Sequence, residues 1–156
     1  MSQGNNPTCI IVLIRKILYF KGIIQFQYPM ENNILGWFEI PVKNMDRAVK
    51  FYESVFDFKM HRQKMNTLDM AWFPWKEDKP GAPGSLVYNE EFYSPSEKGV
   101  LIYLTTPSGD LNQDSEKIQK AGGKIVVPRK QISEDYGFIV VFMDPEGNRI
   151  ALHSRT

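Results

Sequence analysis

This sequence has few of the residues that build disulfides and metal centres. Its 156 residues include one cysteine, Cys9, and two histidines, His61 and His153. One cysteine cannot form a disulfide within the chain, which fits a reducing compartment, so we expect a cytoplasmic location. Basic and acidic side chains nearly balance, 19 against 18. No basic surface for nucleic acid is therefore indicated.

Long uncharged apolar runs are also missing. The most apolar stretch, CIIVLIRKILYFKGIIQFQYP, lies within residues 1–30 and is interrupted by Arg15, Lys16 and Lys21. No run approaches the ~20 residues that a membrane-spanning helix needs. Two interpretations of this arm stay open. It is either an amphipathic helix at a membrane surface or a non-native extension upstream of a natural start at Met30, and we favour the extension.

From residue 34 onward the sequence shows clear periodic patterns. The stretch ILGWFEIPV (34–42) alternates and predicts a strand. Asn44 is a good N-cap for a helix over MDRAVKFYESVF (45–56), whose apolar residues fall on one stripe. Further strands are predicted over residues 57–64, 67–75 and 85–90. The order is therefore strand, helix and three strands over about residues 34–90.

The second half repeats this order. A strand is predicted over residues 99–106, then a helix that Asp110 caps and Gly122 and Gly123 end. Strands follow over residues 124–132, 137–144 and 148–154. Pro128 predicts an edge or a bulge in the first of these. A repeat offset by roughly 64 residues indicates two like modules, about 34–90 and 99–154, in one α+β domain spanning residues 31–156.

Two stretches in these modules resemble a known family. EIPVKNMDRAVKFYESVFDF and AGGKIVVP…GFIVVFMDPEGNRIALHS are similar to the vicinal oxygen chelate superfamily, which includes glyoxalase I, extradiol dioxygenases and bleomycin-resistance proteins. The likeness is greatest to small glyoxalase-related proteins of bacteria. It implies tandem strand-helix-strand-strand-strand modules, mixed sheets curled around a cavity, a small-molecule ligand and a homodimer.

The resemblance also implies where a metal would bind. In metal-dependent members, four strands present ligands to a divalent metal that chelates two substrate oxygens. Transferred to this chain, those positions fall on Trp37, Val87, Leu101 and Ala151. None of these side chains can bind a divalent metal. We therefore expect no metal or other cofactor at the usual site.

Strand alternation extends this set of positions. Side chains two residues apart share a face, so Glu39 accompanies Trp37. Tyr103 accompanies Leu101, and Arg149 and His153 accompany Ala151. The opposite faces, including Val100, Ile102 and Leu104, are expected to pack in the core. The candidate catalytic residues are Glu39 and His153, and the candidate ligand-binding residues are Trp37, Trp72, Val87, Leu101, Tyr103, Arg149 and Ala151.

Each catalytic candidate has an ordinary alternative. Glu39 is either a general base or a carboxylate that is solvated or paired with Arg149. His153, three residues from the end, is either a proton-transfer group or an exposed, frayed side chain. Three functions follow: a proton-transfer or isomerase-type enzyme, a metal-free binding protein of the bleomycin-resistance type, or a dimerising module. An enzyme with a displaced metal on Glu39 and His153 is the weaker form of the first.

Overall fold

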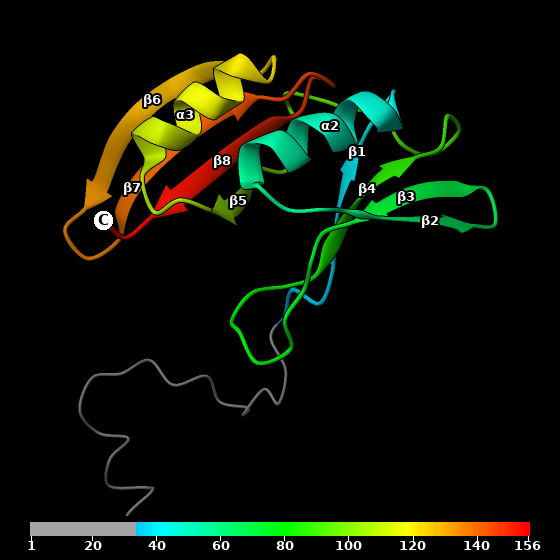
Figure 1. Ribbon diagram of the computed structural model, residues 1–156, viewed down its shortest axis with the longest axis horizontal. Helices are drawn as coiled ribbons and strands as arrows, with labels where there is room; N and C mark the ends of the chain where they lie inside the picture. The colour runs from blue at the N-terminus through cyan, green and yellow to red at the C-terminus, as the bar shows by residue number, and fades with distance from the viewer. Residues whose placement is uncertain (1–33) are drawn as a thin grey trace, which may run out of the picture. The chain divides into compact units, whose positions relative to one another are not determined.

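Two β-α-β-β-β modules follow one another along the chain, as the repeat predicted (Figure 1). The computed structural model describes residues 34–156, of which Leu35–Thr156 form one compact unit. The interpretations of the arm over residues 1–30 lie outside the described residues. Within residues 34–156 no helix is long and apolar enough to cross a membrane.

The first module contains β1 (Phe38–Pro41), α2 (Met45–Phe56), β2 (His61–Met65), β3 (Leu68–Trp72) and β4 (Gly84–Tyr88). The second contains β5 (Ile102–Thr105), α3 (Leu111–Lys120), β6 (Lys124–Ser133), β7 (Gly137–Met143) and β8 (Arg149–Ser154). The predicted α+β class is confirmed. The first strand of each module is shorter than its alternating pattern predicted.

Each module builds one four-stranded mixed sheet. The strand orders are β1-β4-β3-β2 and β5-β8-β7-β6. The pairs β1-β4 and β5-β8, each at one edge of its sheet, are parallel, while the other neighbours are antiparallel. Strand β6 is an edge strand whose register shifts between Val127 and Lys130, where Pro128 predicted an edge or a bulge. The predicted curling of the sheets around a cavity stays a prediction.

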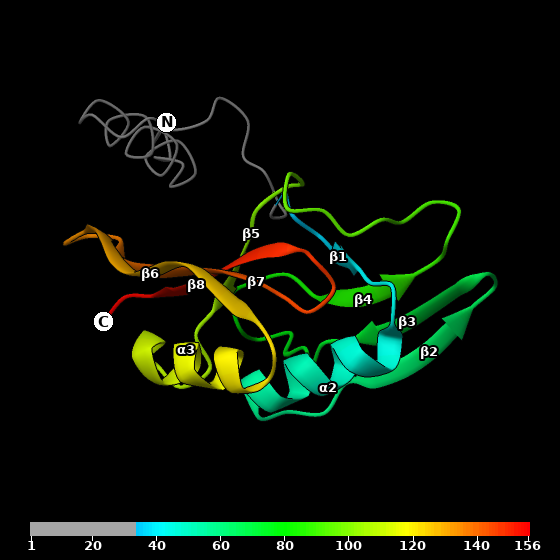
Figure 2. The ribbon, with the colours of Figure 1, turned by 90° about the horizontal axis from the view of Figure 1, so that it is seen from above.

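The helices begin where the capping residues predicted. The Asn44 side chain accepts a hydrogen bond from the Arg47 N–H at 2.9 Å, and the Asp110 side chain accepts one from the Asn112 N–H at 2.8 Å. These carboxylate and amide oxygens satisfy N–H groups that have no partner within the helix. Both helices lie on the same side of the two sheets (Figures 1 and 2).

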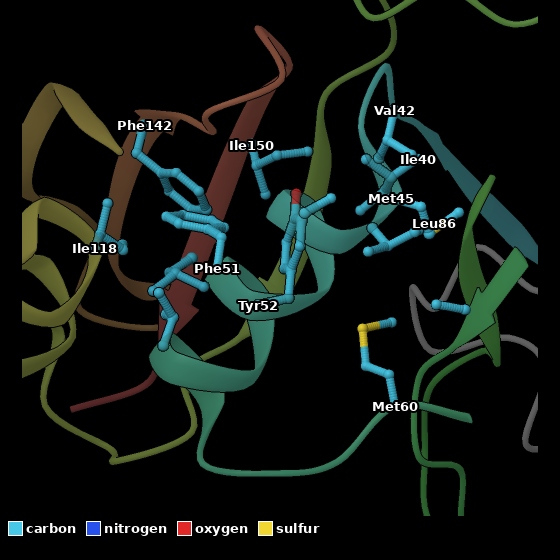
Figure 3. Packing of buried hydrophobic residues seen from close by; sticks show 14 of the residues in the cluster. Ile40, Val42, Met45, Phe51, Tyr52, Met60, Leu86, Ile118, Phe142 and Ile150 are labelled. Carbon is cyan, nitrogen blue, oxygen red and sulfur yellow. The ribbon is translucent and has the colours of Figure 1, made fainter. Parts of the chain in front are cut away.

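One hydrophobic core joins the two modules. Helix α2 buries Met45, Ala48, Phe51, Tyr52 and Val55. Figure 3 shows Phe51 and Tyr52 of this helix between apolar residues of the first sheet, including Ile40 and Leu86, and residues of the second, including Phe142 and Ile150. The modules therefore share a core and do not fold around separate ones.

One predicted core residue is wrong. The side chain of Val100 is 89% exposed, although alternation from Ile102 and Leu104 placed it on the core face. The alternation does not extend back to residue 100, because strand β5 begins only at Ile102. Outside a strand, side chains no longer follow the two-residue period.

The DPEGN turn between β7 and β8 ties the second module to the first. The Glu146 carboxylate accepts hydrogen bonds from the backbone N–H groups of Lys43 and Asn44, at 2.8 and 2.9 Å, and from the Arg47 guanidinium. The Asn148 amide donates to the Pro41 carbonyl at 2.8 Å. This turn therefore holds the end of β1 and the start of α2 against the start of β8.

Candidate functional site

The predicted residues of the first sheet lie on the face opposite the helices. Ile40 and Leu86 point into the core, so the alternate side chains of the same strands point away from it. The register pairs Glu39 with Ser85, and Ser85 with Trp72. These three side chains therefore form one row across the sheet.

Trp37 extends this row by packing against Trp72. The Trp37 and Trp72 rings meet edge to face, with centroids 5.6 Å apart and an interplanar angle of 77°. Trp37 is 39% exposed, and its indole N–H donates to Glu39 at 3.3 Å. The pair offers an aromatic surface beside a carboxylate, which suits a flat ligand with a hydrogen-bonding edge.

Both oxygens of Glu39 are engaged. One accepts from Trp37 and the other accepts from the Tyr93 hydroxyl at 2.5 Å. This hydrogen bond raises the pKa of Tyr93, and burial and the negative charge of Glu39 raise it further, so Tyr93 stays a neutral donor. No ion pair between Glu39 and Arg149 is found within residues 34–156. Glu39 is a positioned hydrogen-bond acceptor.

Three polar atoms near these residues are buried without a hydrogen-bond partner in the described part of the chain. They are the indole nitrogen of Trp72, the hydroxyl of Ser85 and Nε of Arg149. Such an atom costs about 1–3 kcal/mol when it stays unpaired. Buried polar atoms are almost always paired in native proteins. These three atoms therefore lack, among the described residues, the partner that a buried polar atom normally has.

The predicted residues of the second sheet are less uniformly accessible. Register pairs Tyr103 with Ala151, so both share one face. Tyr103 is 54% exposed, whereas Ala151 is fully buried, as is Val87 in the first sheet. Leu101 is half-buried. Val87 and Ala151 therefore pack inside the protein and expose no surface that a ligand could contact.

His153 lies near the C-terminal end of β8. Its Nε2 hydrogen-bonds the Tyr136 carbonyl oxygen at 2.6 Å, so Nε2 carries the proton in this contact. His153 does not line the cleft that contains Glu39. The structure does not bring the two catalytic candidates into that cleft together.

Glu39 and Arg149 do meet in one cleft, called the junction cleft below. It has a volume of about 210 Å³ and lies where β1 meets β8. Its polar lining comes from Glu39, Arg149, Asn148, Ser94 and Ser96. The two serines belong to the segment that connects the modules. The cleft therefore places a carboxylate and a guanidinium from different modules around one small space.

The four positions at which the family resemblance implies metal ligands hold no side chain that can bind a metal. Trp37, Val87, Leu101 and Ala151 occupy them. Within residues 34–156 no group of three or more histidine, cysteine, aspartate or glutamate side chains is placed to hold a metal. The donor set does not fit the metal site that the family resemblance implies. That the protein binds no metal stays a prediction.

Ser94, Ser96 and Asn148 of the cleft were not predicted from the sequence, and neither were two residues beside Glu39. Ser85 could have been found, because it lies two residues before Val87 and alternation puts both on one face. No sequence pattern pointed to Tyr93, since it lies in the irregular segment after β4. Its contact with Glu39 spans 54 residues.

Comparison with known proteins agrees with this architecture. Residues 34–152 match the family model described as Glyoxalase/Bleomycin resistance protein/Dioxygenase superfamily. A glyoxylase-like domain-containing protein of Didymella fabae is 28% identical over 121 residues, which cover 75% of this chain and 90% of that protein.

Solved structures show the same fold. TnmS3, an antibiotic binding protein from Streptomyces sp. CB03234, superimposes with a TM-score of 0.56 at 24% identity, covering 81% of this chain and 99% of that one. Glyoxalase I from Zea mays gives a TM-score of 0.56 at 19% identity over 76% of this chain. The chain spans only 45% of the length of the Zea mays enzyme. With the family match over residues 34–152, the chain belongs to the Glyoxalase/Bleomycin resistance protein/Dioxygenase superfamily.

Proposed function

We propose that this chain binds a small organic molecule at the junction cleft, without a metal, and sequesters it. The observation that carries this proposal is the buried, unpartnered Nε of Arg149 in a cleft that Glu39 also lines. Arginine is suited to carboxylates and other oxygen anions because its planar guanidinium donates in a fixed geometry. A ligand oxygen in the cleft would accept from the Arg149 guanidinium, whose Nε has no partner among the described residues.

The lining narrows the chemistry of the ligand. Arg149 offers hydrogen-bond donors and Glu39 offers an acceptor, so the ligand carries an oxygen acceptor and a hydroxyl, amine or amide N–H group. Trp37 and Trp72 do not line the cleft, but they pack together next to Glu39 and would support an aromatic portion of a ligand that extends past this carboxylate. An antibiotic binding protein of the same fold supports binding as the task. Homodimer formation and a cytoplasmic location remain predictions.

An enzyme that transfers a proton is the alternative function. It would use Glu39 as the base and Arg149 to hold a substrate oxygen. The hydrogen bonds from Tyr93 and Trp37 speak against it, because they already occupy both carboxylate oxygens that would have to reach a substrate proton. Product analysis during ligand screening separates the two functions. Turnover that Glu39→Gln abolishes would favour the enzyme.

A thermal-shift screen of aromatic acids and amides first identifies the ligand that stabilises the protein most. Replacing Arg149 by glutamine should lower the affinity of the protein for this ligand. A lost charge-assisted hydrogen bond costs about 1.5–3 kcal/mol, or about tenfold or more in Kd. Calorimetric titration of the full chain measures it. Arg155→Gln is the matched control, because Arg155 is exposed and outside the cleft. Equal loss in both variants, or no loss in Arg149→Gln, would contradict the proposal.

Metal analysis tests the other half of the proposal. Protein purified without chelator should contain far less than one equivalent of zinc, nickel, iron or manganese, because the four usual ligand positions hold apolar or indole side chains. Elemental mass spectrometry on the full chain measures this content. Treatment with EDTA should also leave the thermal midpoint unchanged. Stoichiometric metal would overturn the metal-free mechanism.

A further inference from the structure

We propose that the chain has a second ligand site, an aromatic groove that binds organic anions with a flat apolar body, such as aromatic carboxylates. The groove has a volume of about 470 Å³, which is in the range of small-molecule pockets. One wall consists of Phe38 on β1, Phe58 in the loop between α2 and β2, and Phe73 and Trp75 in the loop between β3 and β4. Strand β5 provides the other wall, with Ile102 to Thr105.

The first wall is a connected set of phenylalanine rings. Phe73 lies 5.5 Å from Phe38 and 5.9 Å from Phe58, and Phe58 lies 5.5 Å from Phe56, measured between ring centroids. Phe73 also meets the buried Tyr52 ring edge to face at 5.5 Å. All four phenylalanines are only partly buried. The wall is therefore anchored to the core while it keeps apolar surface exposed.

Gly84 shapes this wall. A Cβ atom at Gly84 would lie 2.5 Å from the Phe38 ring, which is closer than non-bonded carbon atoms approach. The glycine lets the ring lie flat against the start of β4, so Phe38 faces the groove in a set position. Such preorganisation reduces the entropy lost when a ligand binds.

The opposite wall and the end of the groove are more exposed. Tyr103 is 54% exposed and Trp75 is 43% exposed, while Ile102 and Leu104 are half-buried. Large apolar side chains that cluster around a concavity differ from single exposed ones, which are normal on any surface. Both walls are thus apolar and accept the faces of a flat molecule.

The charge at the groove selects an anion. Among the residues that line it, the charged ones are Lys76 and Lys79. The Lys79 ammonium lies 3.9 Å from the Asp78 carboxylate, and both side chains are exposed. A pair this long and solvated contributes little. The lysines are therefore available to a carboxylate whose apolar body lies between the walls.

The groove is distinct from the junction cleft. Of the lining residues the two share Ile102, and Glu39 and Arg149 line only the junction cleft. None of the apolar residues Phe38, Phe58 and Phe73 was a candidate site residue in the sequence. Binding here goes beyond the proposed function and does not depend on it.

Titration of the full chain with 2-naphthoate and with the neutral 2-naphthylmethanol tests the proposal. We expect the double variant Lys76→Gln/Lys79→Gln to bind 2-naphthoate about fivefold more weakly, since exposed charge contacts contribute about 0.2–1 kcal/mol each. The affinity for the alcohol should not change. The matched control is Lys64→Gln/Lys130→Gln, which removes the same charge from exposed lysines elsewhere and should leave both affinities unchanged.

A second variant tests the apolar wall. Tyr103→Ser removes an exposed ring and should weaken both ligands at least threefold, with the thermal midpoint unchanged. Arg149→Gln should leave both affinities as in the wild type, because Arg149 lines only the junction cleft. The groove proposal can therefore fail or hold independently of the junction-cleft proposal. The proposal is overturned if 2-naphthoate does not bind, if the Lys76/Lys79 variant binds it as well as the control does, or if Arg149→Gln abolishes its binding.

Discussion

Replacing Glu146 by alanine should lower the free energy of unfolding by about 3 kcal/mol. The Glu146 side chain is completely buried, and its partner Arg47 is half exposed. The carboxylate accepts from two backbone N–H groups and from Arg47. Its removal leaves the N–H groups of Lys43 and Asn44 without a partner at the start of α2, where the helix dipole also favours a negative charge. It therefore loosens the contact between the two modules.

Urea denaturation followed by circular dichroism measures this loss. Glu134→Ala is the matched control, because Glu134 is exposed in the turn between β6 and β7. It should change the free energy of unfolding by less than about 0.5 kcal/mol. A similar small change in Glu146→Ala would show that the turn does not hold the modules together.

The same carboxylate gives stability a defined pH dependence. Burial acts to raise the pKa of Glu146, but the hydrogen bonds from Arg47, Asn44 and Lys43 outweigh it and hold this pKa below its usual range. A lowered carboxyl pKa contributes stability above the unfolded-state value, about 4.3, and this stability is lost as pH falls through the folded-state value. Glu146→Gln should therefore flatten the decline of stability below about pH 4.3, measured by urea denaturation across that range.

Replacing Gly137 by alanine should cost about 3 kcal/mol or more, the sum of backbone strain and steric overlap. Gly137 begins β7 with φ of +74°, a conformation that L-residues rarely adopt. A Cβ atom there would overlap the Ser154 carbonyl oxygen and lie 2.7 Å from the Arg155 Cα. Both contacts are with backbone, so no side-chain rotation relieves them. The end of β8 would have to move away from β7.

Two other glycines separate the two causes. Gly147→Ala has a φ of +100° but no atom within 4 Å of the added Cβ, so it should show strain alone, about 1–2 kcal/mol. Gly36→Ala has neither a positive φ nor a contact and should be nearly neutral. Thermal and urea unfolding of the three variants measure the series. Equal losses at Gly137 and Gly147 would exclude the overlap with Ser154 as a cause.

Local patterns predicted most of the fold. Asn44 and Asp110 cap the two helices as their residue types indicated, and the apolar stripe of α2 faces the core. The repeat of the two modules follows from this order of elements. Strand ends were less predictable: Val100 is exposed because strand pairing stops at Ile102, and pairing depends on the neighbouring strand β8. Alternation alone carries no information about where a partner strand ends.

The candidate site was predictable only in part. Alternation placed Trp37 and Glu39 on one face, and the register confirms that Glu39 shares its row with Trp72. The sequence left open which of the candidate residues lie near Glu39. Arg149 shares the junction cleft with Glu39 while His153 does not, because this depends on how β8 lies against β1. The hydrogen bond from Tyr93 to Glu39 could not be predicted either, since the segment that contains Tyr93 has no periodic pattern.

By itself, the sequence determined the order of elements, the side-chain faces within the strands at residues 38–41 and 149–154, and the residue types at the four metal-ligand positions that the family resemblance implies. These properties follow from local periodicity and from side-chain chemistry, which need no partner. Only the tertiary structure decided that Glu146 clamps the start of α2, that Glu39 and Arg149 share one cleft, and that the phenylalanines of one module face β5 of the other. Each of these contacts joins residues far apart in the chain, and packing between the modules selects them.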